Sequence, residues 1–207
     1  KIVERTTSGG IRHIQVFAYK PGILKTKEEI EGIVLKGVDV DYQWDFFEQY
    51  LEKGHLLEFP DSVTSREIIV SRQTANRLNL KVGEKLDFYF ERSNDFLRRR
   101  FKIAGIYKTG LEDYDRQFAL VDIRQIQNIN QWEADEVGGF EVFIDDLSDL
   151  SLLTEYIYNE EVPSNMMALI VRQTRQNIFE WLALQDINEV VILVLMLLVS
   201  IINMVTA

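Results

Sequence analysis

The C-terminal end of the chain carries no charged residue between positions 190 and 207. This stretch begins with VVILVLMLLV, which is apolar at every position, so a helix formed here would have no polar face. A helix that crosses a bilayer needs about 20 predominantly apolar residues. We therefore predict that residues 190–207 are the start of a transmembrane helix. The alternative is a buried C-terminal helix of a soluble domain.

The rest of the chain has the composition of a folded, acidic domain. Its 207 residues are 46% hydrophobic and 27% charged, and the formal net charge is -10. This charge disfavours nucleic-acid binding, and the lack of Cys excludes disulfides and thiol nucleophiles. The first residues, KIVERTTSGG, include charges and lack the apolar region of a signal peptide. We therefore expect the sequence to begin within a longer protein.

Short runs of β-branched and aromatic residues between turn formers predict strands. These runs lie at 14–19, 33–38, 67–70, 85–90, 101–107, 118–121, 140–144 and 167–171. Helical spacing predicts helices in DFFEQYLEKG, in SRQTANRLNL and at 147–158. The mixture of strands and helices predicts an α+β fold.

A longer helix is predicted just before the uncharged end. In RQTRQNIFEWLALQDINE, which starts at position 172, one stripe carries Ile178, Trp181, Leu182 and Gln185. No Pro or Gly separates this segment from the apolar run, so one continuous helix is expected. Residues 173–189 would then form a stalk that couples the domain to the membrane.

The pattern of elements predicts two subdomains. The ends, residues 1–54 and 137–172, alternate strands and helices, whereas residues 55–136 crowd several short strands and two short helices together. We interpret the ends as one α/β subdomain and the middle as a β-rich insertion.

Sequence patterns for catalysis or metal binding are largely absent. The chain has two His, no H-E-x-x-H, no G-x-S-x-G and no P-loop. Carboxylates occur together in GVDVD, LEDYD and FIDDL, but none follows the calcium-loop pattern. Asp residues at strand ends and helix starts usually accept backbone hydrogen bonds. We therefore predict no catalytic residue and no metal site.

The stretch FERSNDFLRRRF lies between two predicted strands and is expected to form a hairpin. An exposed apolar anchor next to Arg is typical of protein contacts, which makes its tip a candidate partner-binding site: Asn94, Asp95, Phe96, Leu97 and Arg98. The alternative is a solvated loop whose positive charges prevent edge-to-edge strand pairing.

Five segments resemble, in the same order, the extracytoplasmic domain of FtsX/MacB-type ABC transporter permeases, most closely the lipoprotein-releasing LolC/LolE type. They are KPGILKT, EGIVLKGVDVDYQW, SRQTANRLNLKVGEKLDFYF, FKIAGIYKTGLEDYD and the helix that enters the apolar end. The resemblance implies a MacB-like periplasmic core domain with a porter-like α/β subdomain, whose first part would be missing from this sequence, and an inserted β-rich sabre-like one.

The resemblance also implies a function for the domain. Such permeases lie in the bacterial inner membrane with this domain in the periplasm, and they bind a cytoplasmic ATPase and a second permease copy or paralogue. ATP and Mg²⁺ bind to the ATPase, so no cofactor is expected in this chain. Hydrolysis moves the outer domains through the stalk, a process called mechanotransmission, and releases lipoproteins toward the outer membrane.

One subtype of this family recruits a periplasmic chaperone through a Pro-containing hook, and SNDFLRRR, the corresponding stretch here, contains no Pro. Within the family, MacB-like efflux of drugs or peptides and FtsX-like regulation of cell-wall hydrolases are alternative roles. A membrane-anchored sensor domain and an anchored carboxylate-dependent enzyme are alternatives from other classes.

Overall fold

The structure is a computed structural model that describes residues 10–26, 29–92, 95–144 and 150–158, and isolated residues beyond them. The chain divides into two compact units. One consists of Ile11–Phe143, and the other of Lys1–Gly10 with Ile144–Ala207. The larger unit contains most of the described residues and all of the sites considered below.

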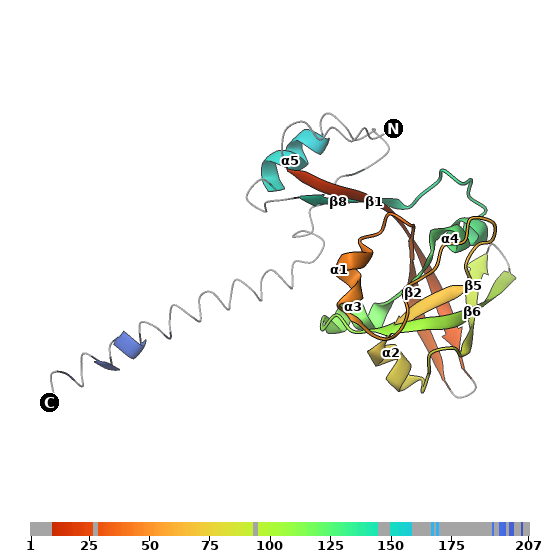
Figure 1. Cartoon of the computed structure of the whole chain (residues 1–207), viewed down its shortest axis with the longest axis horizontal. Helices are drawn as coiled ribbons and strands as arrows, with labels where there is room; N and C mark the ends of the chain where they lie inside the picture. The colour runs from red at the N-terminus through yellow and green to blue at the C-terminus, as the bar shows by residue number, and fades with distance from the viewer. Residues whose placement is uncertain are drawn as a thin grey trace. The chain divides into compact units, whose positions relative to one another are not determined.

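The described part of the chain alternates strands with short helices (Figure 1). The strands are β1 (Ile11–Lys25), β2 (Ile30–Val38), β3 (Leu51–Gly54), β4 (Glu67–Ser71), β5 (Lys85–Arg92), β6 (Asp95–Tyr107), β7 (Phe118–Asp122) and β8 (Gly139–Ile144). The helices are α1 (Trp44–Glu48), α2 (Arg72–Arg77), α3 (Glu112–Gln117), α4 (Ile123–Asn130) and α5 (Leu150–Tyr156).

The strands of the larger unit close into a barrel. Following the pairings from β1, the order is β2, β7, β4, β6 and β5, and β5 pairs again with β1. The β2–β7 and β4–β6 pairs are parallel and the others are antiparallel. Strand β3 joins β6, and β8 joins β1, outside this ring. Closure leaves the ring itself without a free edge.

Side chains fill the barrel because alternate residues of each strand point inward. Phe88 and Phe90 of β5 are fully buried there, together with aliphatic residues of the other strands. A Cβ at Gly22 would lie 2.5 Å from a ring carbon of Phe90, so glycine makes room for this ring. Ile123 and Ile126 of α4 belong to the same core, and α4 therefore packs onto the barrel.

A second apolar cluster covers the outside of the barrel wall. Phe47 of α1 packs with Ile69, Leu120 and Tyr107. The Tyr107 hydroxyl donates a hydrogen bond to the Phe118 carbonyl oxygen at 2.9 Å, and burial raises the pKa of this hydroxyl well above its usual range. This bond joins β6 to the start of β7.

The structure confirms the α+β class and differs from the sequence predictions in detail. The helix predicted in DFFEQYLEKG was wrong beyond Glu48, because residues 51–54 form β3 on the edge of β6. Helix α2 lies where SRQTANRLNL predicted it, with the Ser71 hydroxyl accepting a hydrogen bond from Thr74 N as its N-cap. Of the two short helices expected within residues 55–136 only α2 had been located, and the positions of α3 and α4 had not been predicted.

The expected subdomain boundary at 54/55 falls within one sheet. Strands β1 and β2, which precede it, pair with β5 and β7, which follow it. The compact unit instead continues to Phe143. In the other unit α5 lies within the helix expected at 147–158, and the backbone at Gly10 approaches Leu153 so closely that a Cβ there would lie 2.9 Å from it.

The predicted stalk at 173–189 lies outside the described residues, and so do most of positions 167–171 and 190–207. Met167 and Leu169 are in neither a helix nor a strand. Within 190–207 the individually described residues are helical and exposed: Ile192, Leu195, Met196, Leu197, Val199, Ser200 and Met204. Of the helices that the structure describes, none is both long and apolar enough to span a bilayer.

Candidate interaction surface

The predicted hairpin exists, but the candidate residues lie on its second strand and not in a loop. Strands β5 and β6 pair from Lys85↔Lys102 to Arg92↔Asp95. Asp95, Phe96, Leu97 and Arg98 therefore begin β6, while Asn94 lies outside the described residues. The ladder continues almost to the turn, which leaves little room for the expected loop.

The two apolar residues of this site point to opposite faces of β6. Phe96 is 62% exposed on the outer face. Leu97 is partly buried against the barrel core. Successive residues of a strand alternate between faces, so Phe96 and Leu97 cannot act as one anchor. Of these two residues, Phe96 is the one that is available to a partner on the outer face.

Asp87 of β5 organises the Arg residues beside Phe96. Its carboxylate accepts hydrogen bonds from Arg100 Nε at 2.8 Å, from Arg100 Nη2 at 2.9 Å and from Arg98 Nη2 at 2.6 Å. Hydrogen bonds from Arg100 and Arg98 hold the pKa of Asp87 well below its usual range. The Arg98 and Arg100 side chains remain 51% and 53% exposed. Both guanidinium groups are thus held in place and still accessible.

This surface continues from the hairpin onto β1. The strand register places Ile23 beside Tyr89 and Lys25 beside Asp87, and the Ile23 side chain is exposed. We name the whole surface the basic face and define it by the residues Ile23, Lys25, Lys85, Asp87, Tyr89, Glu91, Phe96, Arg98, Arg100 and Lys102.

Two of the clustered carboxylates, Asp115 and Asp39, accept hydrogen bonds that have a structural role. Asp115 is buried and accepts hydrogen bonds from Thr109 N, Thr109 Oγ1 and Gly110 N, at 3.1, 2.7 and 3.3 Å. Asp39 accepts one from Val40 N at 2.8 Å. Burial, with the Asp39 charge as a second cause, raises the pKa of Asp41.

The described residues contain no group of three metal-binding side chains, and Asp145 and Asp146 lie outside them. The two His residues contact backbone: His13 Nε2 lies 2.7 Å from the Asp41 carbonyl oxygen, and His55 Nδ1 lies 2.7 Å from the Leu56 carbonyl oxygen. Both contacts are made to backbone on exposed parts of the molecule.

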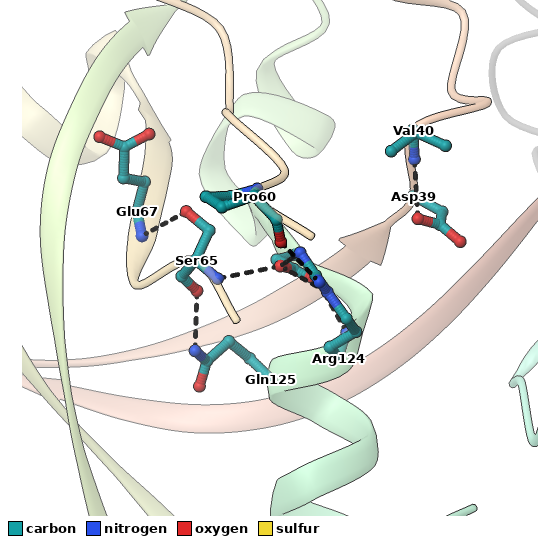
Figure 2. A network of polar contacts seen from close by, with 8 residues as sticks. Asp39, Val40, Pro60, Ser65, Glu67, Arg124 and Gln125 are labelled. Atoms are coloured by element: carbon teal, nitrogen blue, oxygen red, sulfur yellow. Dashed lines mark hydrogen bonds and ion pairs between the residues drawn. The ribbon is translucent and has the colours of Figure 1, made fainter. Parts of the chain in front are cut away.

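A buried polar network holds the segment that leads into β4 (Figure 2). The Asp122 carboxylate accepts hydrogen bonds from Ser65 N at 3.1 Å and from Arg124 N at 2.9 Å. Arg124 pairs with Asp122 at 2.7 Å and also donates to the Pro60 carbonyl oxygen at 3.0 Å. Gln125 donates to the Ser65 carbonyl oxygen at 2.7 Å. Apart from the ion pair between Arg124 and Asp122, each of these contacts anchors backbone, so the network is structural.

Another network joins β8 to the barrel. Lys36 of β2 contacts both carboxylate oxygens of Glu141, at 2.7 and 2.9 Å. Gln15 of β1 donates to Glu141 Oε2 at 2.7 Å and accepts a hydrogen bond from Gln43 N at 3.0 Å. These residues come from three strands and a loop. The basic face remains the surface with accessible, organised polar groups.

The fold defines the class of this domain, an α+β domain built around a closed mixed barrel with short covering helices. The periplasmic region of MacB from Actinobacillus actinomycetemcomitans has this fold: its TM-score is 0.50 at 16% identity, over 74% of this chain and 67% of that one. The extracellular domain of the noncanonic ABC-type transporter YknZ from Gram-positive bacteria matches with a TM-score of 0.48 at 16% identity, over 70% of this chain and 71% of that one. No protein-family model and no curated protein matches the chain.

The role of Phe96 and Arg98 in partner binding stays a prediction, and sequence reasoning missed the residues that organise this surface. Arg98 and Arg100 are two positions apart, which on a strand places them on one face. That signal was readable in the sequence. Their partner Asp87 could not be found, because its position opposite Arg100 depends on the register of the hairpin.

Proposed function

We propose that this chain is the outer domain of an ABC transporter permease. The observation that carries the proposal is the fold, which the periplasmic region of MacB shares. The order of the five resembling sequence segments supports the same class. In this proposal the chain is a non-catalytic subunit, and ATP and Mg²⁺ bind to a separate cytoplasmic ATPase.

The proposed work of the domain is lipoprotein release by mechanotransmission. The domain lies in the periplasm, and the predicted stalk at 173–189 connects it to the inner membrane. ATP hydrolysis in the ATPase moves the domain through this stalk, and a lipoprotein leaves the membrane toward the outer membrane. A second permease copy or paralogue completes the transporter, and a periplasmic chaperone receives the lipoprotein.

A second candidate is efflux of a drug or peptide. The fold shared with the MacB periplasmic region favours it, because that likeness supports a MacB-like role as well as a LolC/LolE-like one. FtsX-like regulation of cell-wall hydrolases uses the same proposed architecture. The three roles differ in what the outer domain acts on, so they are separated by a substrate assay.

The test uses the full-length permease, reconstituted with its ATPase in liposomes that contain a lipid-anchored lipoprotein. ATP should release the lipoprotein to a soluble chaperone. ATP hydrolysis without release would contradict lipoprotein extraction and favour efflux or hydrolase regulation. Ala183→Pro in the predicted stalk should abolish release while hydrolysis continues, because Pro breaks a helix; Ala183→Leu, which preserves helix propensity, is the matched control.

The hairpin residues can be tested as a partner-binding site in the same system. Phe96→Asp should weaken partner binding and leave the domain folded, because Phe96 is exposed on the outer face. Leu97→Asp is unsuitable for this purpose, since Leu97 packs against the core and its replacement would destabilise the domain. Unchanged binding by Phe96→Asp would remove the hairpin from the proposed site.

A further inference from the structure

In the part of the chain that the structure describes, one buried side-chain polar atom has no hydrogen-bond partner: Oε2 of Glu67, the first residue of β4. A carboxylate oxygen that has left water without gaining a donor is costly. Figure 2 shows this carboxylate pointing away from Ser65, whose hydroxyl accepts a hydrogen bond from the Glu67 backbone. The polar network before β4 therefore leaves the Glu67 carboxylate unpaired.

His55, which directly follows β3, presents its ring to the same carboxylate. The His55 Nδ1 atom lies 2.7 Å from the Leu56 carbonyl oxygen. A carbonyl oxygen only accepts hydrogen bonds, so Nδ1 carries the proton and the neutral ring keeps a lone pair on Nε2. This Nε2 atom lies 3.7 Å from Oε1 of Glu67. Two electron-pair donors therefore face each other.

The distance between these two atoms is too long for a direct hydrogen bond and fits a shared metal ion. A charge-assisted N–H···O hydrogen bond is about 2.7–2.9 Å long, so a proton on Nε2 would not join the two groups at 3.7 Å. Two ligands that bind one Zn²⁺ ion at about 2.1 Å, with the tetrahedral angle between them, lie about 3.4 Å apart. A shift of about 0.3 Å would therefore bring both atoms into the coordination shell of one ion.

The backbone holds the two side chains on either side of β6. Strand β3, which precedes His55, pairs with one edge of β6, and β4 pairs with the other at Glu67↔Lys102. His55 N donates a hydrogen bond to the Ala104 carbonyl oxygen at 3.0 Å. A Cβ at Gly105 would lie 2.8 Å from the His55 carbonyl oxygen, so glycine permits this close approach. Sequence patterns did not reveal the pair, because strand register brings it together.

We propose that His55 and Glu67 form a binding site for a divalent transition-metal ion such as Zn²⁺. Imidazole nitrogen and carboxylate oxygen are both ligands of Zn²⁺. The hydrogen bond from Nδ1 to a backbone carbonyl is the contact that usually orients a metal-binding His. A cation beside the carboxylate also offsets the unfavourable burial of Oε2, since it neutralises the charge that this oxygen shares.

The site is open to solvent on the side of the imidazole ring. The side chain of His55 is 50% exposed and that of Glu67 is 19% exposed, so an ion can enter. Lys102 lies beside Glu67 in the strand register, but it is exposed and forms no ion pair with Glu67 among the described residues. Two protein ligands leave the remaining positions of a tetrahedral ion to water.

The first test is NMR of the His ring nitrogens while Zn²⁺ is added to the full 207-residue chain, prepared without a His tag in a mild detergent. The chain has only two His, so His13 serves as the internal control. Zn²⁺ should move the Nε2 signal of His55. It should leave that of His13 in place, because His13 Nε2 lies 2.7 Å from the Asp41 carbonyl oxygen. Mg²⁺ should move neither signal, since it prefers oxygen ligands.

The second test measures the affinity for Zn²⁺ by isothermal titration calorimetry. His55→Ala and Glu67→Gln should each weaken binding at least about tenfold, because loss of a ligand costs no less than loss of a residue that orients one. His13→Ala is the matched control and should bind Zn²⁺ like the parent chain. Glu67→Gln keeps the shape of the side chain, and His55 is half exposed, so both variants should fold.

Binding of Zn²⁺ that depends on both His55 and Glu67 supports the proposal. Binding that does not saturate below about 1 mM would overturn it. An affinity unchanged by either variant would mean an adventitious ion only, and a His55 ring that takes up a proton but no Zn²⁺ would reduce the pair to a proton site. Neither test needs the ATPase or a lipoprotein, so the result is independent of the proposed function.

Discussion

Lys36 and Glu141 lie 105 positions apart in the sequence, and the Lys36 ammonium group contacts both oxygens of the Glu141 carboxylate, at 2.7 and 2.9 Å. The Lys36 side chain is only 6% exposed. Gln15 donates a hydrogen bond to the same carboxylate. This arrangement joins β8 to both β1 and β2, so β8, which lies outside the closed ring, is held by charge as well as by its backbone.

Glu141→Ala should therefore destabilise the domain strongly. The change leaves the buried Lys36 ammonium group without its counter-charge, and a buried charge that loses its partner is costly. We expect the free energy of unfolding to fall by about 3 kcal/mol, measured by urea denaturation.

Glu91→Ala is the matched control, because Glu91 is an exposed carboxylate on a strand. It should change the free energy of unfolding by about 0.5 kcal/mol or less. Lys36→Met combined with Glu141→Leu should recover part of the loss, since neither charge is then buried. Equal effects of Glu141→Ala and Glu91→Ala would show that the ion pair contributes no stability.

Asp122→Ala should destabilise the start of α4 and the segment before β4 together. The fully buried Asp122 carboxylate caps α4 through Arg124 N and also binds Ser65 N. Its loss leaves these donors and the Arg124 guanidinium group without their acceptor, at an expected cost of about 3 kcal/mol in urea denaturation. Asp61→Ala, at an exposed position of the same segment, should cost far less. A loss no larger than that of Asp61→Ala would contradict the structural role of this network.

The fold class could be predicted from the sequence because most strands of the barrel are short runs of β-branched and aromatic residues between turn formers, a pattern that local sequence shows. The closure could not, since it depends on pairings between distant segments such as Val34↔Phe118 and Ile23↔Tyr89. Periodicity identifies a strand and not its neighbours. For the same reason Arg98 could be proposed as a contact residue, while its partner Asp87 emerged only from the register.

Helix α4 was missed although its signal was present. Asp122 is a good N-cap, and Ile123, Ile126 and Ile129 follow at helical spacing. The helix is short and starts directly after β7, so the strand pattern obscured it. The opposite error occurred at residues 51–54, where a helix was predicted and the structure has strand β3. Pairing with β6 provides hydrogen-bond partners for the backbone N–H and C=O groups of these residues.

The ion pairs of Asp87 should make stability depend on pH in acid. The pKa of Asp87 in the folded domain lies below its unfolded value of about 3.9, because Arg100 and Arg98 donate hydrogen bonds to the ionised form. The unfolded chain therefore binds the proton more readily, and the stabilisation is complete above about pH 5 and decreases as the pH falls through the folded pKa.

Asp87→Asn removes this contribution, so the difference in unfolding free energy between the parent chain and the variant should be constant near neutral pH and shrink below about pH 4. Urea denaturation over a pH series measures it. Glu91→Gln, on the same strand, is the control for a general effect of lost charge. A difference that grows toward acid would have the wrong sign and would contradict the depressed pKa.

Gly54 and Gly83 provide a matched test of the contact between β3 and β6. Both have a positive φ, +84° and +88°, which costs any residue with a Cβ about 1 kcal/mol. A Cβ at Gly54 would lie 2.0 Å from the Ala104 carbonyl oxygen, whereas a Cβ at Gly83 would meet nothing within 4 Å. Gly54→Ala should therefore lower the free energy of unfolding by about 2 kcal/mol more than Gly83→Ala, because backbone of β6 must move. Urea denaturation of both variants measures the difference, and equal losses would mean that β3 does not approach β6 this closely in solution.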